Sequence, residues 1–152
     1  MRVAAVSDTG PLIHLAEIES LELLSVFDHL CIPQTVYEEL QRGGLPDRLA
    51  SLDFELVEAG PEQATSSLDA GERAAIAVAN ERDFVLLTDD LAARETAADT
   101  GIEVHGSIGV IALAYSRECI SKSDATSLMR ALQNETSLFV TDAVVERGIR
   151  ML

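Results

Sequence analysis

The sequence has few basic residues and a single lysine, Lys122. Acidic residues number 26 and basic residues 11 among 152, so the formal net charge is −15. A surface of this sign repels nucleic acid at long range, which on charge alone disfavours a DNA-binding module. It also destabilises the fold by self-repulsion unless salt screens it. We therefore expect a halophilic host, in which case the net charge says little about the substrate.

Long apolar runs and cysteines are scarce as well. No stretch approaches the roughly 20 apolar residues that span a bilayer, and the start lacks the basic and apolar regions of a secretion signal. We therefore expect no membrane contact and a cytoplasmic location. The two cysteines, Cys31 and Cys119, are too few and too far apart for a metal knuckle. Each has an apolar setting that favours a role as a small hydrophobe.

What remains is an ordinary globular composition, 47% hydrophobic and 24% charged. It predicts a single domain over residues 1–152, which buries about 70% of its unfolded surface. Apolar strand-like runs alternate with helical ones, which predicts an α/β sandwich with a mainly parallel sheet. The expected strands cover residues 3–7, 30–32, 54–59, 84–88, 102–104 and 137–140. The expected helices are two short ones within 11–27, then 35–41, 68–81, 90–100, 108–115, 122–134 and 142–151, with a loop over 61–67.

Four carboxylates occupy the ends or apolar faces of these elements: Asp8, Glu39, Glu72 and Asp90. Ligands of open α/β sheets bind outside the carboxyl ends of strands, and Asp8 and Asp90 each follow a strand. Glu39 and Glu72 lie among apolar neighbours on helices, where an uncompensated carboxylate is costly. Each acid alone can equally decorate an exposed face or favour a helix N-terminus. As a set, they predict a divalent-metal site.

Clustered carboxylates are the ligands that Mg²⁺ and Mn²⁺ prefer. Such a metal lowers the pKa of a bound water and neutralises charge on phosphoryl oxygens, which predicts hydrolysis of phosphodiesters without a histidine base. His14 is expected to be a partly buried helix residue, and His29 and His105 have no partner pattern. We assign none of the three to catalysis.

Two acidic doublets and one isolated acid need separate interpretation. Glu38 and Glu39 point about 100° apart on a helix, and the apolar pattern places Glu39 on the buried side. Asp89 and Asp90 share a strand-to-helix turn, where we expect Asp89 to cap the helix and Asp90 to bind metal, with Asp89 as the alternative ligand. Asp69 is expected to cap the helix that follows it.

Four further side chains are candidates for substrate binding. Thr9 and Thr88 adjoin the carboxylates and can donate to metal-bound water or phosphate, or can fix the turns alone. Ser107 offers a hydroxyl at a helix N-terminus, a favourable place for phosphate. Arg94 can reach a phosphate, although we expect it to pair with a carboxylate at helical spacing.

Five motifs carry a family resemblance: SDTGPLIHL, IPQTVYEEL, LDAGERAAIAVA, FVLLTDDLAAR and HGSIGVIALA. In this order, from residue 3 to about 132, they closely resemble the PIN-domain superfamily, in particular its small prokaryotic branch near the VapC-type toxins. The resemblance implies a three-layer α/β/α fold, a Mg²⁺- or Mn²⁺-dependent ribonuclease site and a homodimer. It also implies metal ligands at Asp8, Glu39, Glu72 and Asp90, with Asp89 as a close competitor.

Three hypotheses follow. The first is an endoribonuclease that cuts RNA as the toxin of a toxin–antitoxin pair, with an antitoxin protein as partner. The second is a catalytically idle PIN-like module that binds RNA or a partner protein. A phosphatase or receiver is disfavoured, because Asp8 is followed by TGP rather than by the rest of a DxDxT motif. The turn GGLPDR after Glu39, in place of a long basic helix, makes the toxin role less secure than metal binding. Leu21, Leu23 and Leu24 are candidates for a homodimer surface.

Overall fold

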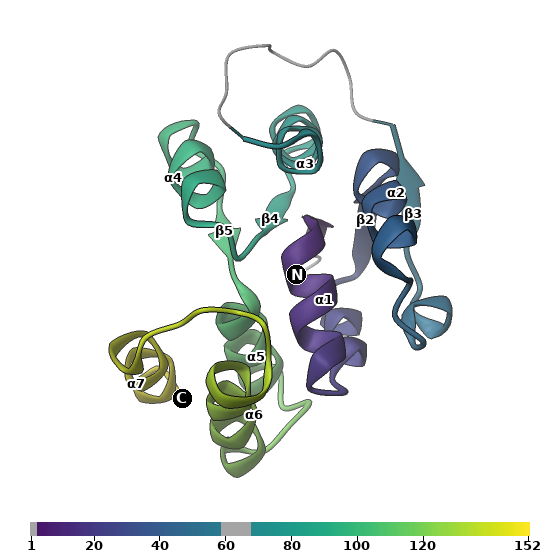
Figure 1. Ribbon diagram of the computed structural model, residues 1–152. Helices are drawn as coiled ribbons and strands as arrows, with labels where there is room; N and C mark the ends of the chain where they lie inside the picture. Colours follow the sequence, from purple (N-terminus) through teal and green to yellow (C-terminus); the bar gives the residue numbers. More distant parts are fainter. Residues whose placement is uncertain (1–2, 59–67) are drawn as a thin grey trace.

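The computed structural model describes residues 3–58 and 68–152. The centre of the protein is a five-stranded, parallel sheet in the order β3-β2-β1-β4-β5 (Figure 1). The strands are β1 (Ala4–Ser7), β2 (His29–Pro33), β3 (Glu55–Val57), β4 (Val85–Leu87) and β5 (Val104–His105). The chain runs outward from β1 to one edge and then returns to β4 on its other side. Because strand order reverses there, a ligand crevice is expected outside the carboxyl ends of β1 and β4.

Helices cover both faces of this sheet. One face carries α1 (Thr9–Glu17), α2 (Gln34–Gly43), α5 (Ser107–Ser116), α6 (Lys122–Glu135) and α7 (Asp142–Arg150), with the short 3₁₀ helices η1 (Leu21–Val26) and η2 (Leu49–Ser51). The other face carries α3 (Ala70–Arg82) and α4 (Leu91–Asp99). None of the described helices combines the length and apolar character needed to cross a membrane.

Two hydrophobic cores follow from the alternation of side chains along each strand. In β1, Ala5 joins the core under α1 and α5, whereas Val6 joins the core under α3 and α4. The same alternation separates Leu87 from Leu86 in β4. The core under α3 is thin, because that helix buries mostly alanine against the strands. These layers confirm the expected α/β/α sandwich with its parallel sheet.

The expected strand over residues 137–140 is wrong, since this segment is a loop between α6 and α7. Two of its backbone N–H groups bind side chains instead of a neighbouring strand: Leu138 N–H donates to Thr136 Oγ1 at 3.1 Å, and Ser137 N–H donates to Glu17 Oε1 at 3.2 Å. Phe139 is 89% exposed, so no sheet face buries it. The expected loop over 61–67 and the end of the strand at residue 59 lie outside the described residues.

Two further expectations about apolar residues are corrected. Leu21, Leu23 and Leu24 pack into the core beneath η1, each 8% exposed or less, so they cannot form a dimer surface. The spacing of these leucines is explained by their packing into the core of a single chain. Cys31 is buried as expected, but Cys119 is exposed.

Candidate metal centre

Asp8 lies at the carboxyl end of β1, directly before α1. It is 5% exposed, and its Oδ2 accepts a hydrogen bond of 2.9 Å from Thr88 Oγ1, at the end of β4. Burial raises the pKa of Asp8 to about 6, and the charges of Asp69 and Glu39 add to this effect. Hydrogen bonds from Thr9 N–H and Thr88 oppose it. The crevice between β1 and β4 therefore holds a carboxyl group that burial makes costly to ionise.

Glu39 joins three helices at this edge of the sheet. On α2 its neighbour Glu38 is exposed, whereas Glu39 is partly buried, as the apolar pattern predicted. Its Oε2 accepts a 2.8 Å hydrogen bond from Thr9 Oγ1 on α1, and its Oε1 accepts a 3.0 Å bond from Gly71 N–H on α3. The Glu39 carboxylate is thus fixed by donors from two helix N-termini, where the helix dipole favours negative charge.

Glu72 begins α3 as part of a reciprocal cap. Asp69 N–H donates to Glu72 Oε1 at 3.0 Å, and Glu72 N–H donates to Asp69 Oδ1 at 2.8 Å, so the expected cap at Asp69 is confirmed. Burial, together with the side-chain hydrogen bond with Asp90 and the charges of Asp69 and Asp90, raises the pKa of Glu72 to about 8, although the backbone hydrogen bond from Asp69 opposes this effect. The Glu72 carboxyl therefore keeps its proton at neutral pH.

The expected helix cap at Asp89 is wrong. Asp90 caps α4, because its Oδ2 accepts a 2.8 Å hydrogen bond from Ala93 N–H. The Asp89 side chain, 7% exposed, turns instead toward α1 and α5. Its oxygens lie 2.7 Å from His14 Nδ1 and accept bonds of 2.6 Å from both the N–H and the hydroxyl of Ser107. These donors come from residues 75 and 18 positions away, which no local capping pattern reveals. Asp90 still faces Glu72, so it remains the better candidate ligand of the two.

The hydroxyl groups predicted to contact substrate are bonded to the acids themselves. Thr9 donates to Glu39, Thr88 donates to Asp8, and Ser107 donates to Asp89. Thr88 Oγ1 also accepts a 3.2 Å bond from Asp90 N–H. These hydroxyl groups therefore orient the carboxylates. The bond from Asp90 N–H shows that Thr88 also fixes its turn, which was the alternative given for Thr9 and Thr88.

Arg94 does not make the expected ion pair with any residue in the described part of the chain. Its Nη1 lies 2.6 Å from the place that a Cβ on Gly106 would occupy, and Asp89 Oδ1 lies 2.7 Å from the same place. Only glycine fits this point of close approach. The exposed guanidinium of Arg94 is thus a cation in the neighbourhood of Asp89 and Gly106.

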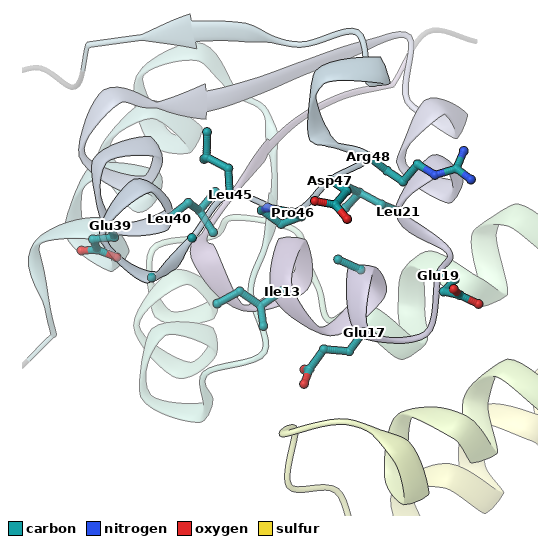
Figure 2. Close-up of a pocket in the computed structure, with 13 residues that line it drawn as sticks. Ile13, Glu17, Glu19, Leu21, Glu39, Leu40, Leu45, Pro46, Asp47 and Arg48 are labelled. Carbon is teal, nitrogen blue, oxygen red and sulfur yellow. The ribbon is translucent and has the colours of Figure 1, made fainter.

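A groove of about 750 Å³ opens beside Glu39 (Figure 2). It runs between α1 and the segment after α2, and Leu40, Leu45 and Ile13 give it apolar walls. Its charged lining is mainly acidic, with one arginine: Glu17, Glu19, Glu39, Asp47 and Arg48. This lining repels a phosphate chain unless salt or bound cations screen it.

The donor set of the acidic cluster suits a hard divalent cation. Asp8, Glu39, Glu72 and Asp90 offer carboxylate oxygens, and a cation would offset the burial and the like charges that raise the pKa values of Asp8 and Glu72. No three of these four acids, however, have ligand atoms that all lie within 4.8 Å of one another. Within the described ranges, the one group of three whose ligand atoms all lie within 4.8 Å of one another is elsewhere, at His29, Cys31 and Glu55.

Comparison with known proteins places the fold. Residues 4–152 match a family described as a PIN domain. Among solved structures, a PilT N-terminus domain protein from the hyperthermophilic archaeon Sulfolobus solfataricus P2 is similar, with a TM-score of 0.60 and 21% sequence identity. The likeness covers 76% of this chain and 95% of that chain, and at this identity it shows the fold alone. The comparison with curated proteins gave no match.

Proposed function

The chain belongs to the PIN-domain family, whose match spans residues 4–152, and on this premise we propose that it is a divalent-metal-dependent endoribonuclease that hydrolyses RNA phosphodiesters. PIN domains are generally nucleases and typically use divalent metal ions. The observation that carries the proposal is the burial of two acids with raised pKa values, Asp8 and Glu72, at the carboxyl edge of β1 and β4. Buried like charges are costly for folding, so a functional use explains them better than chance.

The residues that would hold Mg²⁺ or Mn²⁺ are Asp8, Glu39, Glu72 and Asp90. When bound, the cation lowers the pKa of a water ligand and neutralises charge on the phosphate. Thr88 orients the Asp8 carboxylate, and Thr9 orients that of Glu39. Glu72, whose pKa is raised to about 8, holds a proton at neutral pH that it would have to release to serve as a ligand. Arg94, in the neighbourhood of Asp89, would offer a positive charge to the substrate phosphate.

The test is RNA cleavage by the purified protein at high salt, with Mn²⁺, with Mg²⁺ or with EDTA. We expect metal-dependent cleavage that Asp8→Asn reduces by at least about 100-fold, whereas the exposed-site control Asp53→Asn keeps the activity of the original chain. Circular dichroism checks that each variant is folded. Stabilisation by Mn²⁺ without cleavage would favour the idle binding module. The absence of both stabilisation and cleavage would contradict the proposal.

We further propose a homodimer, an antitoxin protein as partner and a cytoplasmic location, each supported by the family alone. The dimer surface must lie away from the buried leucines of η1. Co-expression with the protein encoded by the neighbouring reading frame tests the toxin role, since an antitoxin relieves growth arrest and co-purifies with the chain. Absence of growth arrest on expression of the chain alone would contradict the toxin role.

A further inference from the structure

A second group of metal-ligating side chains lies at the opposite end of the sheet from the acidic cluster. His29 and Cys31 stand two residues apart on β2 and therefore project from the same face. Glu55 lies on the neighbouring edge strand, β3, and its Cα pairs with that of Cys31 in the strand register. His29 is the first residue of β2, whereas the acids follow the last residues of their strands. The two groups are therefore separate sites.

The ligand atoms of this group converge. His29 Nε2 lies 3.5 Å from Cys31 Sγ and 3.4 Å from Glu55 Oε1, and all three atoms lie within 4.8 Å of one another. A tetrahedral Zn²⁺ with bonds of about 2.0 to 2.3 Å places neighbouring ligand atoms about 3.5 Å apart. The two separations from His29 Nε2 match that spacing, and the ligand atoms of Cys31 and Glu55 lie within 4.8 Å of each other.

We propose that His29, Cys31 and Glu55 form a binding site for Zn²⁺ or a chemically similar transition-metal ion. A thiolate, an imidazole and one carboxylate suit a borderline-soft ion, whereas Mg²⁺ and Mn²⁺ prefer oxygen ligands alone. Three protein ligands leave the fourth position to water, which is the arrangement of an open zinc site. Binding forms the sulfur–zinc bond and releases the thiol proton of Cys31 to solvent.

The surroundings already support such a site. The two oxygens of Glu55 have different neighbours: Oε1 faces His29, and Oε2 lies 3.5 Å from Arg82 Nη1. Arg82 can therefore orient the carboxylate from outside the ligand shell, a role typical of second-layer partners. The His29 ring packs edge-on against Phe84, with 5.6 Å between ring centroids, which restricts its rotation.

The site is reachable from solvent although its sulfur is buried. The side chains of His29 and Glu55 are 44% and 51% exposed, whereas Cys31 is fully buried. An ion can thus enter from the edge of the sheet and meet the thiol last. A bound ion would join β2 to β3, an edge strand of only three residues.

The experiment uses Co²⁺ as a spectroscopic probe for Zn²⁺, with the full chain in the reduced state. Cys119→Ser provides the background, because it removes the exposed thiol and leaves Cys31 as the single cysteine. We expect one equivalent of Co²⁺ to give a thiolate-to-metal charge-transfer band that one equivalent of Zn²⁺ removes and excess Mg²⁺ does not. In this background Cys31→Ser should abolish the band, and His29→Asn or Glu55→Gln should weaken Co²⁺ binding at least about tenfold.

Two controls separate this site from other sources of signal. His105→Asn removes a similar surface pair, since His105 Nε2 lies 3.2 Å from Glu103 Oε2, and it should leave the band unchanged. Asp8→Asn should also leave it unchanged, so the result does not depend on the nuclease proposal. No band, or a band that persists in Cys31→Ser, would overturn the inference. If Cys31→Ser does not fold, the exposed His29→Asn variant decides.

Discussion

Asp8 is a residue whose burial opposes folding. The carboxyl is nearly inaccessible at the end of the central strand, and one hydroxyl and one backbone N–H offset only part of the cost of its charge. In the unfolded chain the same group is solvated and ionises at its ordinary pKa. The difference between these two states links the stability of the protein to pH.

We predict that Asp8 costs stability as the pH rises from about 4 to about 6 in metal-free buffer. The folded pKa of about 6 lies above the ordinary value of 3.8, so across this range the unfolded state releases the proton first and gains relative stability. Asp8→Asn removes this effect. In urea unfolding with EDTA, the free energy of unfolding of the variant, relative to that of the original chain, should increase by up to about 3 kcal/mol between pH 4 and pH 7. Parallel pH profiles for the two proteins would contradict the raised pKa.

Asp89 has a different role, because its partners come from α1 and α5 rather than from the acidic cluster. Asp89→Ala should leave the donors of His14 and Ser107 without a buried acceptor, which costs about 2 to 4 kcal/mol in unfolding free energy. Asp53→Ala, at an exposed position, should change stability by less than about 0.5 kcal/mol. Equal unfolding midpoints in urea for the two variants would show that the Asp89 network is unimportant for the fold.

At the scale of elements, the N-terminus of α3 is the most constrained part of the site. Its first turn supplies the reciprocal cap between Asp69 and Glu72 and the N–H that binds Glu39. A Cβ at Gly71 would lie 2.6 and 2.7 Å from the two Glu39 oxygens. Glycine is required here by the approach of the carboxylate from α2, since the helix itself tolerates alanine.

Gly71→Ala therefore separates folding from metal binding. The clash falls on the flexible end of Glu39, so we expect the carboxylate to move while α3 keeps or gains stability by up to about 1 kcal/mol. Binding of Mn²⁺, measured by isothermal titration, should weaken about tenfold or more. Gly43→Ala is the matched control, because a Cβ there meets no described atom within 4 Å. Unchanged Mn²⁺ affinity in Gly71→Ala would argue against Glu39 as a ligand.

The sequence predicts elements better than it predicts partners. The apolar runs of β1 and β4 and the helical spacing on α3 were sufficient for the sandwich, because burial on two faces constrains those residues locally. Asp89 was wrongly predicted to cap the helix that follows it. Aspartate is a favoured capping residue at both positions, and the choice between them depends on Ser107, in a distant helix. The loop at 137–140 was mistaken for a strand because the sequence does not show whether a phenylalanine in an apolar run is buried, and Phe139 is exposed. The group around His29 was missed because one ligand lies on another strand.

At the scale of the whole molecule, a net charge of −15 opposes folding by self-repulsion. We predict that the melting temperature rises steadily from low salt to molar KCl, as self-repulsion is screened and acidic surface acquires counterions. Differential scanning calorimetry at fixed pH measures this rise. A melting temperature that stays flat or falls with KCl would contradict the halophilic interpretation.

The position of β1 has a consequence for how the chain is made. It is the first of the described strands along the chain and the middle strand of the sheet, so β2 can pair with one of its edges, and β3 with β2, once residue 57 has left the ribosome. The other edge of β1 stays unpaired until β4 is made, and there Asp8 accepts a hydrogen bond from the hydroxyl of Thr88, 80 positions further along the chain. Until then an unpaired edge is open to wrong partners, and slow non-local pairing sets the pace of folding. The acidic cluster is thus assembled late in translation, and a truncated chain that ends before Thr88 is expected to have no nuclease activity.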